Sequence, residues 1–320
     1  AYIGDIAAEG SSGKGFRDSV FVCEPIGHLV KRSIIKQAGL RLTAQRAQPN
    51  HDFVASTDTW FLPSSLATGP DGALYLSDMY RLWVEHPKFL PPEISARLDW
   101  RAGDDRGRIY RIVPVGSKPR SFDPPESLED TVALLADENG WRQFLGQRLL
   151  VEEQSTQPIP QVRALLQHEN PTVRLHALWT LDGLNALEGN DVVSVMDDPD
   201  STVRVHSIRL ARTKLSDTDV LDAVATHVDD PEIRVRFEVA KTLSASDQAD
   251  STRLLAQLAL SDGLNSSFAD GLLTSAKDCA GEILSALFRS NDFVSHGNAK
   301  RIGLVKRIAS IIGARGEEQE

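Results

Sequence analysis

Two patterns of hydrophobic and polar residues divide the chain. Up to about residue 115, short runs of β-branched, aliphatic and aromatic residues alternate with clusters of Gly, Pro, Asp and Ser. After about residue 127, apolar residues recur three and four positions apart. The first pattern predicts short β-strands joined by turns, and the second predicts amphipathic helices. We therefore expect a mixed fold that begins with β-structure and continues as an all-α part.

The clearest strand signal lies in residues 68–81 (T-G-P-D-G-A-L-Y-L-S-D-M-Y-R). Proline fixes its own φ and the two glycines permit positive φ, so the run begins with a tight turn. Residues 73–76 then predict a strand that ends near Asp78. A turn followed by a strand with a polar end is typical of one blade of a β-propeller, where strand ends face one side of the disc.

Further strands are predicted on both sides of this run. Residues 19–25 and 27–32 predict a hairpin, and residues 108–113 predict the closing strand of the sheet. Residues 81–100 contain too many prolines for a helix or an interior strand, so we expect a long surface excursion. Residues 10–15 predict a flexible loop that lacks the spacing of a phosphate-binding loop.

A complete propeller needs more sequence than this part of the chain holds. Propeller blades take roughly 40 to 50 residues each, and a closed ring needs about four or more of them. Residues 1–115 supply about two blades, so we predict a partial β-propeller that cannot close alone. The sequence begins in what resembles the middle of a domain, which indicates a fragment of a longer protein.

The helical part is repetitive. Arg174, Arg204 and Arg234 occupy the same place in three similar segments, so the period is 204 − 174 = 30 residues and then 234 − 204 = 30. Each segment follows a polar break that contains Pro. Antiparallel helix pairs with Pro near the start of the second helix are typical of HEAT repeats. With weaker segments before and after, we predict an α-solenoid of about five to six HEAT-like repeats.

These patterns predict four parts of the chain. Residues 1–115 are the C-terminal part of a β-propeller, and residues 116–126 are a Pro-rich linker. Residues 127–315 are the HEAT-repeat α-solenoid, and residues 316–320 are a disordered polar tail.

Recurrent polar residues of the solenoid have two interpretations. The three arginines form either an anion-binding series or internal bonds to carboxylates and carbonyls of neighbouring repeats, and we expect the internal bonds. His176 and His206 share the repeat period, since 206 − 176 = 30. Helices of neighbouring repeats pack roughly 10 Å apart, which is too far for the two histidines to share a metal, so we expect no metal site there.

Charge and composition narrow the class of partner. Residues 1–120 hold 16 Lys and Arg against 13 Asp and Glu, and residues 121–320 hold 19 against 32, so their net charges are +3 and −13. An acidic second half argues against nucleic acid as a partner. The sequence contains no apolar run of transmembrane length and no signal peptide in this fragment. Cys23 and Cys279 form no CxxCH motif, which excludes a c-type haem within this chain.

Several motifs of the first part resemble a known family. They are residues 20–32 (V-F-V-C-E-P-I-G-H-L-V-K-R), 53–61 (F-V-A-S-T-D-T-W-F), 69–81, 85–87 (E-H-P) and 101–112 (R-A-G-D-D-R-G-R-I-Y-R-I). Together they are similar to the end of the propeller in the membrane-bound dehydrogenase-domain proteins of Planctomycetes and Verrucomicrobia. Those proteins join a propeller similar to sorbosone and quinoprotein glucose dehydrogenases to HEAT repeats, and often to a c-type cytochrome domain. This sequence departs from that pattern because it has neither the first blades nor the haem motif.

The resemblance implies a periplasmic or otherwise exported protein. It implies quinone-dependent oxidation of a sugar or polyol by the full-length protein, with pyrroloquinoline quinone (PQQ) and calcium as cofactors and with this fragment inactive alone. The alternative is a non-enzymatic scaffold that binds a protein or carbohydrate partner through the solenoid.

Polar residues at strand ends and in the excursion are the candidate site residues, because such positions surround the pockets of ring-shaped folds. His86 is the candidate catalytic residue, as acceptor of a proton from a sugar hydroxyl. The candidate cofactor-binding residues are Asp58, Trp60, Asp78, Tyr80, Arg81 and Arg106. An arginine and a tryptophan suit a planar anionic quinone through charge and stacking.

Each of these residues also has a purely structural interpretation. Asp78 and Arg106 are equally suited to brace loops, and Trp60 is equally suited to the core between blades. For Asp71, and for Asp104 and Asp105 in the next turn, we leave open a contribution to a calcium site or ordinary turn chemistry.

Overall fold

A computed structural model gives the fold of the chain as two compact units. It describes residues 2–3, 16, 18–84, 86–116, 118, 120–246, 249–276, 278–295 and 298–315. The predicted loop at residues 10–15, the acidic residue of the 85–87 motif and the predicted tail at 316–320 lie outside this described part. Unit 1 comprises residues 1–38 and 42–146, and unit 2 comprises residues 39–41 and 147–320.

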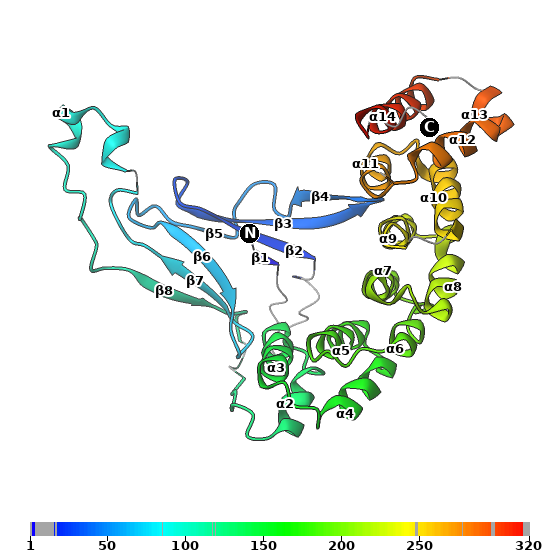
Figure 1. Cartoon of the computed structure of the whole chain (residues 1–320). Helices are drawn as coiled ribbons and strands as arrows, with labels where there is room; N and C mark the ends of the chain where they lie inside the picture. The colour runs from blue at the N-terminus through cyan, green and yellow to red at the C-terminus, as the bar shows by residue number, and fades with distance from the viewer. Residues whose placement is uncertain are drawn as a thin grey trace. The chain divides into compact units, whose positions relative to one another are not determined.

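Unit 1 contains two antiparallel sheets (Figure 1). The first sheet consists of β1 (Tyr2–Ile3), β2 (Ser19–Glu24), β3 (Leu29–Ala38), β4 (Arg41–Arg46) and β5 (Val54–Ala55). The predicted hairpin is confirmed as β2 and β3, which pair with Phe21 opposite Arg32. Strand β4 continues the sheet beyond β3 and was not expected, because all its residues are exposed and it carries no apolar alternation.

The second sheet contains the predicted turn at residues 69–72 and the predicted strand at residues 73–76. Its order is β6 (Pro63–Thr68), β7 (Leu74–Asp78) and β8 (Arg108–Ile112). The turn at residues 69–72 joins β6 to β7, and the predicted closing strand is confirmed as β8. The register places Asp78 opposite Arg108 at one end of the sheet and Leu74 opposite Ile112 at the other.

A shared hydrophobic core joins the two sheets of unit 1. Phe21 and Val30 come from the first sheet, and Leu74 and Leu76 come from β7. Phe61 precedes β6 and completes the buried cluster. Each contributing strand directs alternate side chains to this core, as the period of two residues requires.

The excursion between β7 and β8 includes two short helical turns. These are η2 (Pro87–Phe89) and α1 (Pro92–Ser95), and both have Pro at the first or second position. The expectation that the prolines exclude helix was wrong here, because Pro is tolerated where the backbone N–H has no helical acceptor. Within the described residues, unit 1 shows two open sheets and no closed barrel or ring, so the propeller stays a prediction.

Helices form the rest of the chain. They are α2 (Leu128–Leu134), α3 (Gly140–Glu153), α4 (Ile159–Ala164), η3 (Leu165–Gln167), α5 (Pro171–Gly183), α6 (Gly189–Val193), α7 (Ser201–Ala211), η4 (Arg212–Lys214), α8 (Thr218–Thr226), η5 (His227–Asp229), α9 (Ile233–Leu243), α10 (Ala249–Asp262), α11 (Ser266–Ser275), α12 (Ala280–Arg289), α13 (Asn291–Ser295) and α14 (Ala299–Arg315). In unit 2, α5, α7, α9 and α11 lie side by side, with α6, α8 and α10 as a second layer (Figure 1). None of the helices in the described part is both long enough and apolar enough to cross a membrane.

The polar breaks between predicted helices act as N-caps. The side chains of Asn170, Asp200 and Glu232 accept a backbone N–H two residues further on and so begin α5, α7 and α9. Such caps satisfy N–H groups that have no partner inside the helix. The capping positions therefore fix where each repeat starts.

Helix α2 and the first half of α3 belong to unit 1. Asn139, which is 2% exposed, donates to the carbonyls of Gly69 and Pro70 at 3.0 Å. Arg142 donates to the same Pro70 carbonyl at 2.8 Å and to Ser121 O at 2.7 Å. These bonds tie the start of α3 to the turn before β7. The expected domain boundary at residues 116–126 stays a prediction.

Candidate functional site

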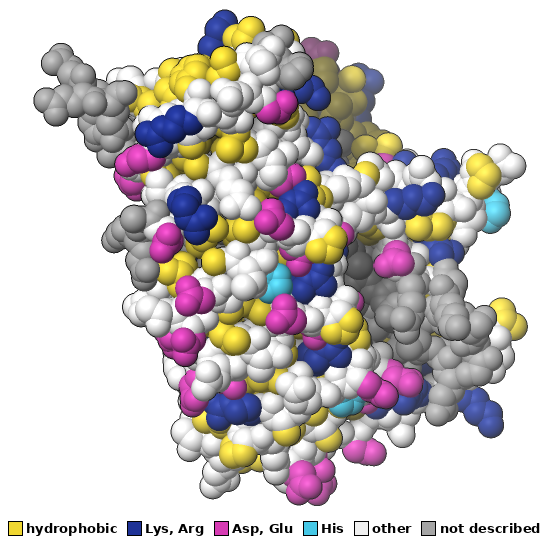
Figure 2. All heavy atoms as spheres, turned by 90° about the vertical axis from the view of Figure 1, so that its right-hand side faces the viewer, with side chains coloured by type: hydrophobic (Ala, Val, Ile, Leu, Met, Phe, Trp, Pro, Cys, Tyr) yellow, Lys and Arg dark blue, Asp and Glu magenta, His cyan; other side chains and the backbone are white. Residues whose placement is uncertain are grey.

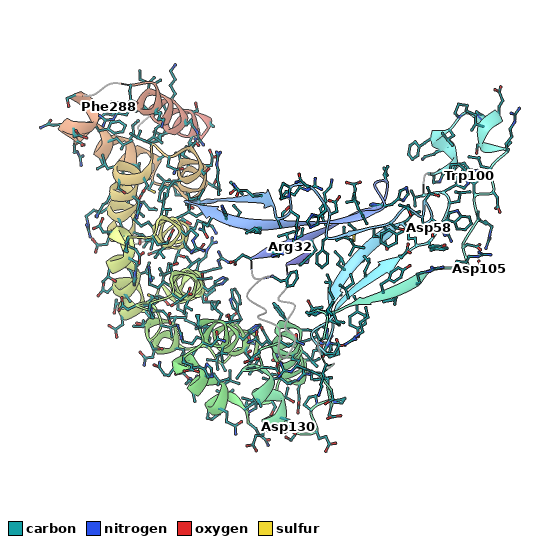
Figure 3. All side chains as sticks on the ribbon, turned by 180° about the vertical axis from the view of Figure 1, so that it is seen from behind. Arg32, Asp58, Trp100, Asp105, Asp130 and Phe288 are labelled. Carbon is teal, nitrogen blue, oxygen red and sulfur yellow. The ribbon has the colours of Figure 1, made fainter. Side chains whose placement is uncertain are left out.

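One end of the second sheet of unit 1 gathers several of the predicted site residues. Asp58 and Trp60 lie in the loop between β5 and β6, and Tyr80 follows β7. Arg106 precedes β8, and Arg108 begins it. Figure 3 shows Asp58 at this end of unit 1, on the side of the excursion that carries Trp100 and Asp105. We call these five residues the Arg–aromatic cluster.

Tyr80 is the centre of the Arg–aromatic cluster. Its hydroxyl donates to Asp58 Oδ2 at 2.8 Å, and the guanidinium carbon of Arg108 lies 3.5 Å from the centroid of its ring. Its backbone has φ of 46°, a left-handed conformation that is uncommon for a bulky residue. The Tyr80 N–H donates to Asp78 Oδ1 at 2.9 Å, which supports this turn.

Hydrogen bonds set the protonation of the Asp58–Tyr80 pair. The backbone N–H of Trp60 first, and then the Tyr80 hydroxyl, lower the pKa of Asp58. The bond to this carboxylate raises the pKa of Tyr80. Near neutral pH the pair therefore consists of a carboxylate acceptor and a phenol donor.

Trp60 and a glycine form the other side of the Arg–aromatic cluster. The Trp60 and Tyr80 ring centroids are 5.7 Å apart, and the Arg106 guanidinium carbon lies 5.9 Å from the Trp60 ring. Gly103 has φ of 87°, and a Cβ built on it would lie 2.5 Å from Tyr80 O and 3.0 Å from the Trp60 ring. Only glycine allows this close approach of the excursion to the cluster.

Asp78 lies beneath this cluster and is 2% exposed. Its Oδ1 accepts the N–H groups of Leu62 and Tyr80 at 2.8 and 2.9 Å, so it braces both loops as its structural interpretation expects. Its Oδ2 is one of few buried side-chain atoms in the described part of the chain without a hydrogen-bond partner. Arg108, its partner across the sheet, stacks on Tyr80 instead.

The remaining predicted residues have different surroundings. Arg81 is half-buried and follows Tyr80 directly, where its Cα lies 3.3 Å from the Cβ position of Gly103. His86 is exposed in the excursion, and its Nδ1 accepts the N–H of Lys88 at 3.2 Å. The structure thus brings together Asp58, Trp60, Tyr80 and Arg106, and it places His86 in its own local turn.

Sequence reasoning missed Arg108. The residue was predicted in the closing strand of the sheet, and its alternation with Ile109 gave no functional signal. The available signal was the motif R-G-R, which places two arginines on the same side of a strand start.

The residues at this end of unit 1 fit a planar anion only in part. The Arg106 guanidinium carbon lies 5.9 Å from the Trp60 ring centroid, and that of Arg108 lies 3.5 Å from the Tyr80 ring centroid. Trp60 and Arg106 are therefore the residues that could hold a quinone, by stacking and by charge.

The suggested calcium ligands do not come together. Asp71 accepts Arg111 Nε at 2.6 Å, the Tyr75 hydroxyl at 3.1 Å and the Ala73 N–H at 3.1 Å. Asp104 binds Arg101 at 2.6 Å. The described residues contain no group of three or more His, Cys, Asp or Glu side chains placed to hold a metal ion. Asp71 thus braces its own turn, and Asp104 and Asp105 form ion pairs with Arg101 and Arg106 at 2.6 and 3.7 Å.

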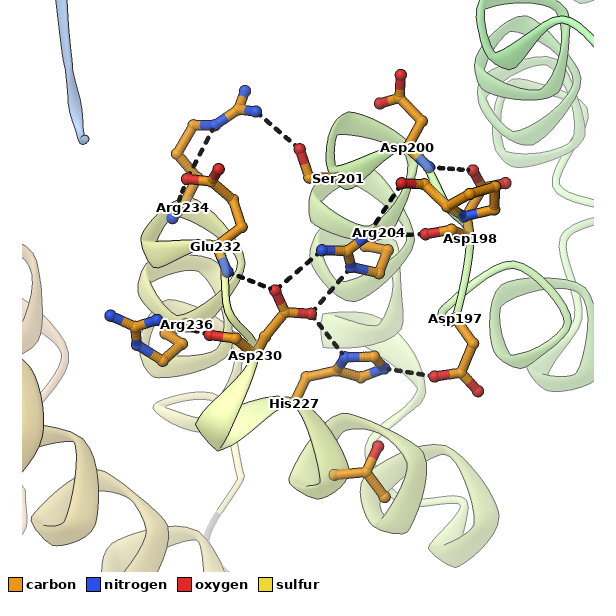
Figure 4. Close-up of polar contacts among 12 residues, drawn as sticks. Asp197, Asp198, Asp200, Ser201, Arg204, His227, Asp230, Glu232, Arg234 and Arg236 are labelled. Carbon is orange, nitrogen blue, oxygen red and sulfur yellow. Dashed lines mark hydrogen bonds and ion pairs between the residues drawn. The ribbon is translucent and has the colours of Figure 1, made fainter. Parts of the chain in front are cut away.

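In unit 2, an Arg–Asp ladder connects successive repeats. Its pairs are Arg174–Asp198, Arg204–Asp230 and Arg236–Asp262. Each arginine binds both carboxylate oxygens at 2.6 to 3.0 Å and also donates to the carbonyl six residues before it. Figure 4 shows the middle pair, where Asp230 also contacts His227. The expected internal bonds are therefore present, and the ladder arginines are not an anion-binding series.

The third member of the ladder is Arg236 and not Arg234, which corrects the expected period. The spacing is 204 − 174 = 30 residues and then 236 − 204 = 32. Each ladder arginine is the fourth residue after its N-cap, and the N-cap of α9 is Glu232. Pro231 precedes this cap, whereas Pro171 is the first residue of α5, so the alignment of Arg234 with Arg174 was wrong by two residues.

A second ladder runs along α3, α5, α7 and α9. Its pairs are Gln147–His176 at 2.7 Å, Trp179–His206 at 3.0 Å and Arg209–Glu238 at 2.9 and 3.0 Å. The first members are 32 and 30 residues apart, since 179 − 147 = 32 and 209 − 179 = 30. Two equivalent series of polar pairs therefore hold the repeats in register.

Comparison with known families separates the β-rich part of the chain from the helical repeats, as the structure does. Residues 4–116 match a family described as "Domain of unknown function (DUF7133)", and residues 189–265 match a family described as "HEAT repeats". Unit 2 is accordingly an α-solenoid that contains HEAT repeats, and residues 4–116 are similar to the first family.

Comparison with curated proteins gives no match. Among solved structures, the crystal structure of an engineered protein is similar at 17% identity and a TM-score of 0.36. The similarity covers 59% of this chain and 100% of that protein, and a similarity this weak carries no argument.

Proposed function

We propose that the chain is a binding scaffold whose solenoid holds a protein partner. The observation that supports this most directly is the pair of inter-repeat ladders. They fix neighbouring repeats against each other before any partner arrives, and a preorganised surface loses less entropy on binding. Extended surfaces of stacked helix pairs are a common means of protein recognition.

Charge indicates the kind of partner. The net charge of residues 121–320 is −13, and exposed carboxylates recur at the repeat turns in Asp197 and Asp229. The Asp197 side chain is 96% exposed. Figure 2 shows acidic side chains spread over one face of the molecule, with basic ones between them. The partner is therefore a protein with a basic surface segment.

A defined probe tests this proposal. A fluorescein-labelled Lys-rich peptide is titrated with the chain at physiological salt, and its anisotropy is followed. The double variant Asp197→Asn and Asp229→Asn should weaken binding by about tenfold, since two carboxylates leave the surface. The matched control, Asp99→Asn and Asp105→Asn, removes the same charge from unit 1 and should have little effect. Absence of binding at physiological salt, or equal loss in both variants, contradicts the proposal.

Quinone-dependent oxidation of a sugar or polyol is the second candidate function. The observation that favours it is the gathering of Asp58, Trp60, Tyr80 and Arg106 at one end of unit 1. In this proposal Trp60 and Arg106 would hold PQQ by stacking and charge, and the ligands of its companion calcium ion would come from outside the described residues. His86 accepts the proton of a sugar hydroxyl, in a longer exported protein with more blades.

Cofactor binding separates the two functions. PQQ and Ca²⁺ are added to the chain, and the melting temperature and dye reduction with aldoses are measured. A shift that disappears in Arg106→Ala and remains in Arg97→Ala, an exposed arginine of the excursion, supports the oxidoreductase. If neither this chain nor a longer form of the protein shows a shift in melting temperature or reduces the dye, the oxidoreductase proposal is refuted.

A further inference from the structure

One pair of the second ladder requires a neutral histidine. Trp179 on α5 donates its indole N–H to His206 Nδ1 on α7 at 3.0 Å, and the two rings meet edge to face with centroids 5.7 Å apart. An indole N–H is a donor only. His206 Nδ1 must therefore present its lone pair, with the hydrogen on Nε2. A proton on Nδ1 and this hydrogen bond exclude each other.

In the equivalent pair of the preceding repeat, the histidine is the hydrogen-bond donor and not the acceptor. His176 Nδ1 lies 2.7 Å from Gln147 Oε1, which is an acceptor. Nδ1 of His176 therefore carries a hydrogen, and protonation of the ring leaves this bond in place. The third pair, Arg209–Glu238, joins two groups that stay charged near neutral pH. Of the three pairs in the second ladder, only Trp179–His206 is therefore broken when its histidine is protonated.

The surroundings of His206 also disfavour its charged form. Burial lowers the pKa of His206, Arg209 on the same helix lowers it further, and Glu238 on α9 opposes them. From α5 the ring meets Trp179, which is uncharged. Arg209 is itself bound to both oxygens of Glu238, so the carboxylate that would attract a protonated His206 is already paired.

We propose that the contact between α5 and α7 is a pH-sensitive point of the solenoid. It is held while His206 is neutral and loosens when His206 is protonated. A group whose pKa is lowered by folding adds stability above its ordinary pKa, about 6.5 for histidine, and this stability is lost as the pH falls below that value. Mild acid therefore breaks the Trp179–His206 hydrogen bond in particular, while Arg174–Asp198 of the Arg–Asp ladder still connects α5 to the turn before α7.

The test follows the indole N–H of Trp179 by NMR in the full chain, assigned with Trp179→Phe. Its protection factor, which corrects for intrinsic exchange, should fall by about tenfold between pH values of about 7.5 and 5.5. In His206→Asn, the amide oxygen accepts in place of Nδ1 and does not titrate, so the fall should disappear. The matched control is His168→Asn, because His168 Nδ1 accepts only the N–H of Asn170 in its own turn. This control should retain the full response.

Two outcomes overturn the proposal. One is a wild-type protection factor that does not change with pH, and the other is the same fall in His206→Asn as in the wild type. If that variant does not fold, the pKa of His206 is measured directly from its ring resonances. It should lie below the ordinary histidine value and rise in Trp179→Phe; an unchanged pKa in Trp179→Phe also refutes the proposal.

Discussion

The arginines at positions 234 and 236 lie on the same helix but have different partners. Arg236 binds both oxygens of Asp262 at 2.7 Å, and the two side chains are 19% and 9% exposed. Arg234 donates to the Ser201 hydroxyl at 2.9 Å. Arg236→Met leaves a carboxylate nearly buried without its counter-charge, so it should lower the free energy of unfolding by about 3 kcal/mol. Urea denaturation measures this loss.

The matched variant is Arg234→Met on the same turn of the helix. It removes one hydrogen bond to a neutral hydroxyl and a partly exposed ion pair with Glu232 at 3.6 Å, so a loss of about 1 kcal/mol is expected. Equal losses in the two variants would mean that the Arg–Asp ladder contributes no more than a surface contact.

Gly103 and Gly107 give a second comparison between single residues. A Cβ at Gly103 would meet the Tyr80 carbonyl at 2.5 Å in a backbone with φ of 87°, whereas a Cβ at Gly107 would meet its nearest atom at 3.7 Å. Gly103→Ala should therefore move the excursion away from Trp60 and destabilise unit 1 by about 1 to 3 kcal/mol. Trp fluorescence and thermal unfolding report this change. Gly107→Ala should behave like the wild type, and similar spectra for both variants would argue against the close approach.

At the scale of the helix, the contact between α7 and α9 depends on Glu238, which is 4% exposed. Burial alone would raise its pKa, but Arg209 and then Lys241 outweigh burial and lower the pKa of Glu238 below its ordinary value. Folding stability from this group is thus present above about pH 4.5 and is lost as the pH falls through the lowered pKa. Glu238→Gln should remove this part of the acid dependence of the melting temperature, and Glu282→Gln on α12 should keep it.

The helices and most strands were predictable because their signals are local. N-caps such as Asn170 and Asp200 coincide with the polar breaks, and apolar residues keep the period of each element. The displacement from Arg234 to Arg236 was not predictable, because a proline can precede an N-cap or follow it. Strand β4 was missed because its exposed residues show no alternation, and pairing with β3 determines its conformation.

The candidate site was predictable only as a set of residue types. Asp58 and Tyr80 are 22 residues apart, and their hydrogen bond depends on the left-handed backbone of Tyr80, which composition does not reveal. Trp179 and His206 meet only once the repeats stack, so the second ladder was also outside the reach of local patterns. Contacts between residues far apart in the sequence determine both the Asp58–Tyr80 bond and the second ladder.

At the scale of the whole molecule, strand β8 predicts how copies of the chain meet. Within the described residues β8 pairs with β7 on one side only, and Ile109 on it is 72% exposed. Exposed apolar edge strands tend to pair with further strands. Two copies of β8 paired antiparallel about Tyr110 would place Ile109 opposite Arg111 and Arg108 opposite Ile112, so no two arginines would face each other.

The chain should therefore self-associate through unit 1, and sedimentation velocity over a range of concentrations measures this. Ile109→Lys places a lysine opposite Arg111 of the second copy, so it should weaken association by about tenfold. Ile26→Lys is the matched control, because Ile26 is 74% exposed in the β2–β3 turn and belongs to no edge strand. A wild-type chain that remains monomeric at all concentrations contradicts edge pairing, and so does equal weakening by the two lysines, since bulk charge would then explain the effect.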